Sequence, residues 1–190
     1  EPKIDHDTAV FDIVKASDND SLKTDIKVGL DMFEGLLGYR AVQFTPGAAI
    51  YSPLLHESLL QNGIRSIHVQ RYKAYPLGDG KYEKSFLYTG KTNEVGQRYI
   101  VRNCVFEPFL DDRTHNLNAV NNCLLNIDAA FRMHAPAMVS THRVNFAGAI
   151  ESIHRDESLR MLNELLHEIL KRWPDVEFVS GATLDKILFD

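Results

Sequence analysis

The chain has 190 residues and a net charge of −5, and 44% of its residues are hydrophobic. This composition is sufficient for one substantial core and differs from that of a disordered chain. The sequence has no Lys/Arg cluster, which argues against a nucleic-acid partner, and no apolar run of about 18 residues, which argues against a membrane span.

Helical and strand-like segments alternate along the chain. The expected helices cover residues 22–37, 53–62, 117–131 and 155–172, with a short one from about residue 183. The expected strands cover residues 41–44, 64–69, 97–106, 135–139 and 176–179. Asp20 or Ser21 is the expected cap of the first helix, and Ser52 caps the second. Gly38 and Gly63 stand where left-handed helix ends are expected.

Residues 71–95 differ in texture from the rest of the chain. Aromatic residues alternate there with Lys and Gly, and Gly78-Asp79-Gly80 is a turn signal between two strand-like runs. This pattern predicts a hairpin excursion on the surface. Cys104 and Cys123 fall in apolar runs, so we expect both to be buried and unpaired.

About five strands separated by helices are typical of α/β proteins, in which helices cover a parallel sheet. A closed eight-fold barrel needs about 250 residues. The pattern therefore predicts either an open sheet or a partial (β/α) barrel whose first strands precede residue 1. In both cases the loops that follow the strands should lie along one rim, where such proteins bind ligands.

The loop after residues 135–139 carries the most chemistry. His142, Arg143 and Asn145 follow an apolar run within four residues. A His moves protons near neutral pH, and Arg and Asn can hydrogen-bond sugar hydroxyls or a carboxylate. A helix-capping loop with a solvated His explains the same residues without a function. Glu107, in another rim loop, is either a functional carboxylate or a turn residue before Pro108.

Five stretches stand out by their order and spacing. They are YRAVQFTPG (39–47), PLGDGKY (76–82), RN (102–103), STHRVNF (140–146) and RWPDVEF (172–178). Together they resemble the carboxyl-terminal half of a bacterial branch of the polysaccharide deacetylase superfamily. The resemblance implies a distorted (β/α) barrel of about seven strands. This chain would then be a single barrel-like domain over residues 1–190 that lacks its first strands.

The resemblance also implies a function. It indicates a carbohydrate-active hydrolase that removes acyl groups from a glycan with a divalent metal, and it suggests a periplasmic or secreted protein. The family holds its metal with an Asp pair and a His-x-x-x-His motif in the first strands, and this sequence contains neither. Asp5-His6-Asp7 has the wrong spacing and is interpreted as a solvated segment. The metal ligands are therefore expected outside this chain.

The resemblance assigns roles to individual residues. His142 occupies the position of the general acid that protonates the leaving amine. Phe44 and Gly47 replace the Arg and the Tyr of the family's Arg-x-Pro-Tyr segment, which puts its usual chemistry in doubt. A structural turn explains Pro46-Gly47 equally well. The candidate substrate-binding residues are Thr45, Gly47, Asn103, Arg143 and Asn145.

Two other functions fit the sequence. A barrel that binds a glycan without hydrolysing it is consistent with the altered Arg-x-Pro-Tyr segment. A glycosidase would need two opposed carboxylates, for which Glu107 with Asp111 or Asp112 is the nearby pair. The sequence leaves the sugar, the metal and the oligomeric state open.

Overall fold

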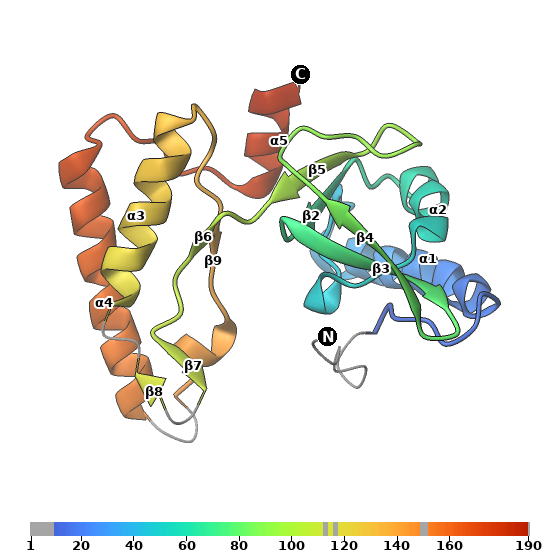
Figure 1. Ribbon diagram of the computed structural model, residues 1–190, viewed down its shortest axis with the longest axis horizontal. Helices are drawn as coiled ribbons and strands as arrows, with labels where there is room; N and C mark the ends of the chain where they lie inside the picture. The colour runs from blue at the N-terminus through green and yellow to red at the C-terminus, as the bar shows by residue number, and fades with distance from the viewer. Residues whose placement is uncertain (1–9, 112–113, 116–117, 149–151, 190) are drawn as a thin grey trace. The chain divides into compact units, whose positions relative to one another are not determined.

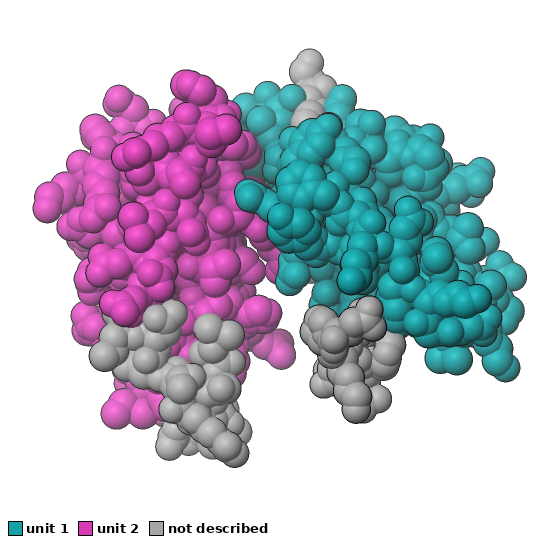
Figure 2. Space-filling model, in the orientation of Figure 1, with its two compact units in different colours: residues 1–101, 179–190 teal, residues 102–178 magenta. Residues whose placement is uncertain are grey.

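The computed structural model describes residues 10–111, 114–115, 118–148 and 152–189. The chain divides into two compact units, a first unit of residues 1–101 with 179–190 and a second unit of residues 102–178 (Figure 2). Each unit has its own buried apolar core. The sequence predicts one domain over residues 1–190, and no composition shift in it signals this division.

The first unit contains a parallel sheet of three strands in the order β1–β2–β5, of which β2 and β5 are labelled in Figure 1. The strands are β1 (Gln43–Phe44), β2 (Ser66–Val69) and β5 (Arg98–Val101). The helices of this unit are α1 (Asp18–Leu37), η2 (Gly47–Ala49), η3 (Pro53–Leu55), α2 (His56–Gln61) and α5 (Gly181–Phe189). Leu22 of α1 and Leu59 of α2 share one core with Ile67 of the central strand. This arrangement explains why Ser66, Ile67 and Val69 of β2 are buried.

The aromatic middle of the chain forms an antiparallel hairpin of β3 (Tyr72–Gly78) and β4 (Lys81–Phe86). Asp79 and Gly80 both have positive φ (52° and 69°), as a tight hairpin turn requires. The hairpin does not lie wholly on the surface, because Lys73 and Tyr75 on one face of β3 are buried. The period of two therefore places alternate residues of β3 in the core of the first unit.

The glycines predicted the ends of the helices correctly, whereas the predicted caps at the helix starts were correct only in part. Gly38 and Gly63 both have left-handed φ (77° and 93°), as predicted. The Ser52 hydroxyl accepts a hydrogen bond from the Leu54 N–H, which confirms its role as a cap. The predicted cap of α1, Asp20 or Ser21, was wrong, because this helix begins at Asp18, whose carboxylate accepts from the Val14 and Lys15 N–H groups before the helix.

The second unit combines short strands with two long helices. Its strands are β6 (Cys104–Val105), β7 (Phe109–Asp111), β8 (Thr114–His115) and β9 (Val139–Ser140). Its helices are α3 (Ala119–Arg132), η4 (Arg143–Phe146) and α4 (Ser152–Arg172). β6 pairs in parallel with β9, and β7 pairs antiparallel with β8. Phe106, Leu124 and Leu165 are buried together in its core. Cys104 and Cys123 are buried free thiols, as predicted.

Three predicted strands differ from the structure. Residues 97–106 form two strands, because the Asn103 amide bonds the backbone of Pro136 and Met138 at the break between β5 and β6. Only Val139 of the predicted strand 135–139 is in a strand, and it is 43% exposed. His134 has a positive φ of 53°, and Pro136 cannot donate to a ladder. Both features delay the start of the strand.

Residues 176–179 form no strand in the described structure. Val176 packs against the core of the second unit, while Phe178 is 61% exposed. The β-branched composition of this segment suggested a strand, but no described strand pairs with it. The β-propensity of these residues was therefore not sufficient to form a strand where no described strand pairs with them.

The described residues form a mixed α/β structure with parallel strands and helices, as predicted. The sheets seen in them are open and do not close into a barrel. Among the same residues, no helix has both the length and the hydropathy needed to cross a membrane.

Candidate functional site

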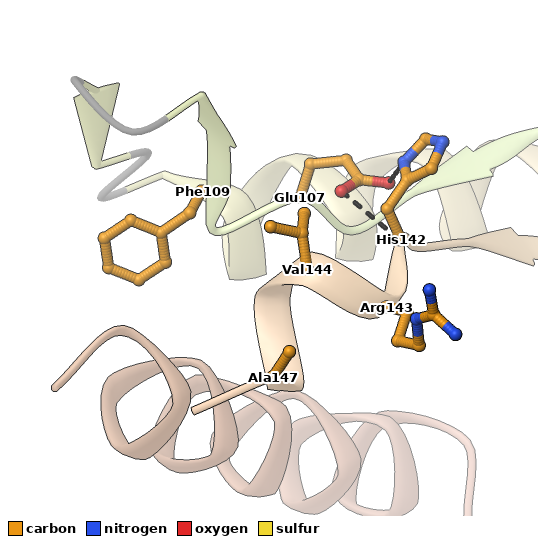
Figure 3. A pocket seen from close by; sticks show the side chains of 6 residues that line it. All are labelled: Glu107, Phe109, His142, Arg143, Val144 and Ala147. Atoms are coloured by element: carbon orange, nitrogen blue, oxygen red, sulfur yellow. Dashed lines mark hydrogen bonds and ion pairs between the residues drawn. The ribbon is translucent and has the colours of Figure 1, made fainter. Parts of the chain in front are cut away.

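Glu107 and His142 meet at the carboxyl ends of two neighbouring strands. β6 and β9 are parallel, with Val105 opposite Ser140. The chain therefore leaves both strands at the same edge, with Glu107 two residues after β6 and His142 two residues after β9. The Glu107 Oε1 and His142 Nδ1 atoms are 2.7 Å apart, and the two side chains point toward one another (Figure 3).

The two partners differ in exposure. The Glu107 side chain is 6% exposed and that of His142 is 72% exposed. A carboxylate only accepts hydrogen bonds, so Nδ1 of His142 carries the proton that it donates to Glu107. In the neutral imidazole this leaves Nε2 as an acceptor, and in the imidazolium Nε2 is a second donor. The buried carboxylate therefore fixes a histidine whose other nitrogen is accessible.

Asn145 holds the same carboxylate on its other oxygen. Its Nδ2 atom donates to Glu107 Oε2 at 2.6 Å and to the His142 carbonyl at 3.0 Å. Its Oδ1 atom accepts from the Phe109 N–H at 3.0 Å. Asn145 is fully buried, at 0% exposure. It therefore joins the loop after β6 to the loop after β9.

A hollow of about 590 Å³ opens beside the Glu107–His142 pair. It is lined by Glu107, Phe109, His142, Arg143, Val144 and Ala147 (Figure 3). The volume lies within the range of about 300–1,000 Å³ that is usual for small-molecule sites. Its walls combine apolar side chains with one carboxylate, one imidazole and one guanidinium. The Phe109 ring is also stacked on His154, with centroids 4.3 Å apart.

The predicted site residues of the second unit occupy three different environments. His142 and Arg143 are exposed and line the hollow. Asn145 was expected to bind substrate, but its burial leaves it no access to one. Asn103 lies at the amino end of the strand pair, where its amide bonds the Pro136 carbonyl and the Met138 N–H. These bonds give Asn103 a structural role at the end opposite His142.

Thr45 and Gly47 lie after β1 in the first unit, and both are exposed. Ala48 and Ala49 beside them have left-handed φ of 50° and 57°. Such a conformation costs roughly 1 kcal/mol or more for each non-glycine residue, so the loop is held in a strained turn. The predicted convergence of Thr45 with His142 in one cleft stays a prediction, because the two residues belong to different units.

The pairing of Glu107 with His142 was missed from the sequence. The signal was present, since each residue follows a short strand by two positions and parallel neighbours end at the same edge. The predicted strand 97–106 obscured it, because β6 was not separated from β5.

The first unit contains a second polar cluster. His56 Nδ1 lies 2.6 Å from Glu94 Oε1, and His56 Nε2 lies 2.9 Å from the Tyr51 hydroxyl. The Tyr75 hydroxyl donates to Tyr99 beside them. Burial lowers the pKa of His56, and the hydrogen bond with Glu94 opposes that change. The cluster borders a smaller hollow of about 280 Å³. Nothing in the sequence pattern distinguished His56 from a structural residue.

The side chain of Lys73 is buried beside this cluster. It is 4% exposed, and its Nζ atom has no hydrogen-bond partner among the described residues. The atom lies 2.8 Å from the ring centroid of Tyr51, a contact that favours the ammonium form. Burial acts in the opposite direction and lowers the pKa of Lys73 to about 6. Because no oxygen atom of the described residues accepts a hydrogen bond from the amine, we expect burial to have the larger effect on its pKa.

The described residues do not fit a complete metal site. Among them, no group of three or more His, Cys, Asp and Glu side chains is arranged to hold an ion. Asp5-His6-Asp7 and Asp112 lie outside the described residues. The divalent metal that the resemblance implies would therefore need ligands beyond these residues.

Comparison of the chain with protein-family models, with curated proteins and with solved structures gave no match.

Proposed function

We propose that the chain is part of a carbohydrate-active hydrolase in which His142 is the general acid that completes removal of an acyl group from a glycan. The observation that carries the proposal is the 2.7 Å hydrogen bond between buried Glu107 and exposed His142, at the carboxyl ends of adjacent parallel strands. Ligands of α/β proteins bind at such ends. A partial or distorted (β/α) barrel, a divalent metal held outside this chain and export of the protein belong to the same proposal.

The pair is suited to proton transfer late in the reaction. When a tetrahedral intermediate collapses, the bond from the acyl carbon to the leaving nitrogen or oxygen breaks, and the leaving atom needs a proton. His142 can give this proton from Nε2 while Nδ1 stays bonded to Glu107. The carboxylate stabilises the imidazolium before the transfer and fixes the ring direction. The proposal assigns proton donation to His142. It assigns none of the described residues to the activation of the attacking water.

The hollow is suited to a sugar with polar and apolar faces. Phe109 and Val144 offer an apolar wall, and Arg143 offers hydrogen-bond donors for hydroxyl or carboxylate oxygens. The same features support a second candidate, a domain that binds a glycan without hydrolysing it. The replacement of the family's Arg and Tyr by Phe44 and Gly47 favours this alternative.

Acetate release from N- and O-acetylated oligosaccharides by the full-length protein, with added divalent metal, tests the proposal. We expect His142→Ala to lower kcat by about 10²- to 10⁴-fold, with little change in KM, because acid assistance operates in the transition state. His167→Ala is the matched control, since His167 is exposed on α4 and bonds only a helix carbonyl in the described structure. Equal rates for wild type and His142→Ala would remove His142 from the mechanism. Glycan binding without acetate release would favour the second candidate.

A further inference from the structure

We infer that Asn145 is a positioning residue, which fixes the Glu107 carboxylate and through it the tautomer and direction of the His142 imidazole. The inference rests on the proposed acid–base function and deepens it. It assigns a role to a residue that contacts neither a substrate nor the accessible Nε2 atom of His142.

The orientation of the buried Glu107 carboxylate depends on its hydrogen-bond donors. Glu107 is 5% exposed, so water contributes little to its orientation. One oxygen accepts from His142 Nδ1. The other accepts from Asn145 Nδ2 at 2.6 Å and from the His142 N–H at 3.4 Å. The longer contact is weak, so the amide of Asn145 provides the strong bond to this oxygen. Without it, a buried anionic oxygen would lose its main partner.

The amide of Asn145 is itself oriented by its hydrogen bonds. The Phe109 N–H donates to Asn145 Oδ1, and the His142 carbonyl accepts from Asn145 Nδ2. Rotating the amide by a half turn would place its oxygen against a carboxylate and a carbonyl, and its NH₂ group against an N–H. The surroundings therefore permit one orientation. In that orientation Nδ2 donates to Glu107 Oε2 and to the His142 carbonyl, with a longer contact of 3.3 Å to Thr141 Oγ1.

An Asn side chain suits this position better than Asp or Ser. An Asp at this position would bring a second carboxylate to the distance of 2.6 Å that Nδ2 now occupies. Two carboxylates so close share a proton, and Glu107 would then cease to be a simple acceptor for His142. A Ser would be too short to reach the same oxygen. Both substitutions should therefore disturb the Glu107–His142 hydrogen bond while the core of the second unit is preserved.

The imidazole ¹⁵N chemical shifts of His142 test this role directly. In the neutral form of the wild type, we expect a protonated Nδ1 and an unprotonated Nε2. In Asn145→Ser and Asn145→Asp we expect both tautomers to be populated, and Asn121→Asp is the control because Asn121 is exposed on α3. Two different substitutions guard against one variant failing to fold. A single Nδ1–H tautomer in either folded Asn145 variant would overturn the inference.

Kinetics provides the second measurement. Asn145→Ser should lower kcat by about 10- to 100-fold, the usual effect of removing a group that orients a functional side chain, and KM should change little. If the wild type releases no acetate but the tautomers mix in the variants, the proposed function fails and the positioning role stands. If the wild type is active and Asn145→Ser keeps its kcat and its tautomer, the positioning role is overturned.

Discussion

His56 and Glu94 form a hydrogen bond of 2.6 Å in which the imidazole is buried and the carboxylate exposed, with side-chain exposures of 2% and 62%. Glu107 and His142 form a bond of the same type with the exposures reversed, 6% and 72%. A histidine can exchange protons with a ligand only when its second nitrogen is accessible. In the first pair that nitrogen faces the Tyr51 hydroxyl. Of these two histidines, His142 is therefore the one with the exposed side chain.

The pH dependence of stability should report on Lys73. Its pKa is about 6 in the folded protein and 10.5 in an unfolded chain. Between these values the unfolded chain binds a proton that the folded chain does not, so the free energy of unfolding rises with pH. One such proton corresponds to a slope of about 1.4 kcal/mol per pH unit between about pH 7 and 8.

Lys73→Met should abolish this slope and stabilise the protein at pH 7, and urea unfolding at several pH values measures both effects. Lys84→Met on β4 is the control, because Lys84 is exposed. A pH slope that is the same in Lys73→Met and wild type would show that the amine is charged in the folded state.

Replacement by alanine of two glycines near the end of α1 should change the free energy of unfolding in opposite directions. Gly38 has a φ of 77° and ends the helix, so Gly38→Ala should cost about 1 kcal/mol of unfolding free energy. Gly35 lies inside the helix, and a Cβ atom there meets no atom within 4 Å. Gly35→Ala should therefore stabilise by about 0.5–1 kcal/mol. Urea unfolding of the two variants checks the pair, and a change of the same sign in both would contradict the assigned helix end.

Arg143 should contribute to binding more than to turnover. It lines the hollow, but it is not bonded to the Glu107–His142 pair in the described structure. We expect Arg143→Ala to raise KM about tenfold with kcat nearly unchanged, which is the effect of losing one charged hydrogen bond. Steady-state kinetics on an acetylated oligosaccharide measures this, with Arg160→Ala on α4 as the control. A loss confined to kcat would instead place Arg143 in the proton transfer.

The sequence predicted the helices well and the strands poorly. Long apolar periodicities such as that of α4 extend over many turns, so an error of two or three residues leaves the element intact. Strands of two residues, such as β6 and β9, give almost no periodic signal. Their positions depend on tertiary contacts, as the bonds from Asn103 to the backbone beside β9 illustrate.

Only part of the candidate site could be predicted, because the contacts between its residues are tertiary and leave no local signal in the sequence. His142 was identified because a titratable residue after an apolar run can be recognised locally. Its partner Glu107 lies 35 positions away, and only the pairing of β6 with β9 joins them. Asn145 was identified as polar and near the site, but its burial depends on the loop after β6. Local patterns therefore indicated candidate residues, and the fold determined which of them lie together.

The most direct test of the Glu107–His142 pair is a double-mutant cycle on kcat/KM for deacetylation, with Glu107→Gln, His142→Ala and the double variant. We expect Glu107→Gln alone to lower kcat/KM by about 10²-fold, because the amide cannot accept from both His142 and Asn145. If Glu107 acts through His142, the double variant should be no slower than His142→Ala. If the fold-loss in kcat/KM of the double variant equals the product of the two single losses, the account is contradicted, because the two residues would then act independently.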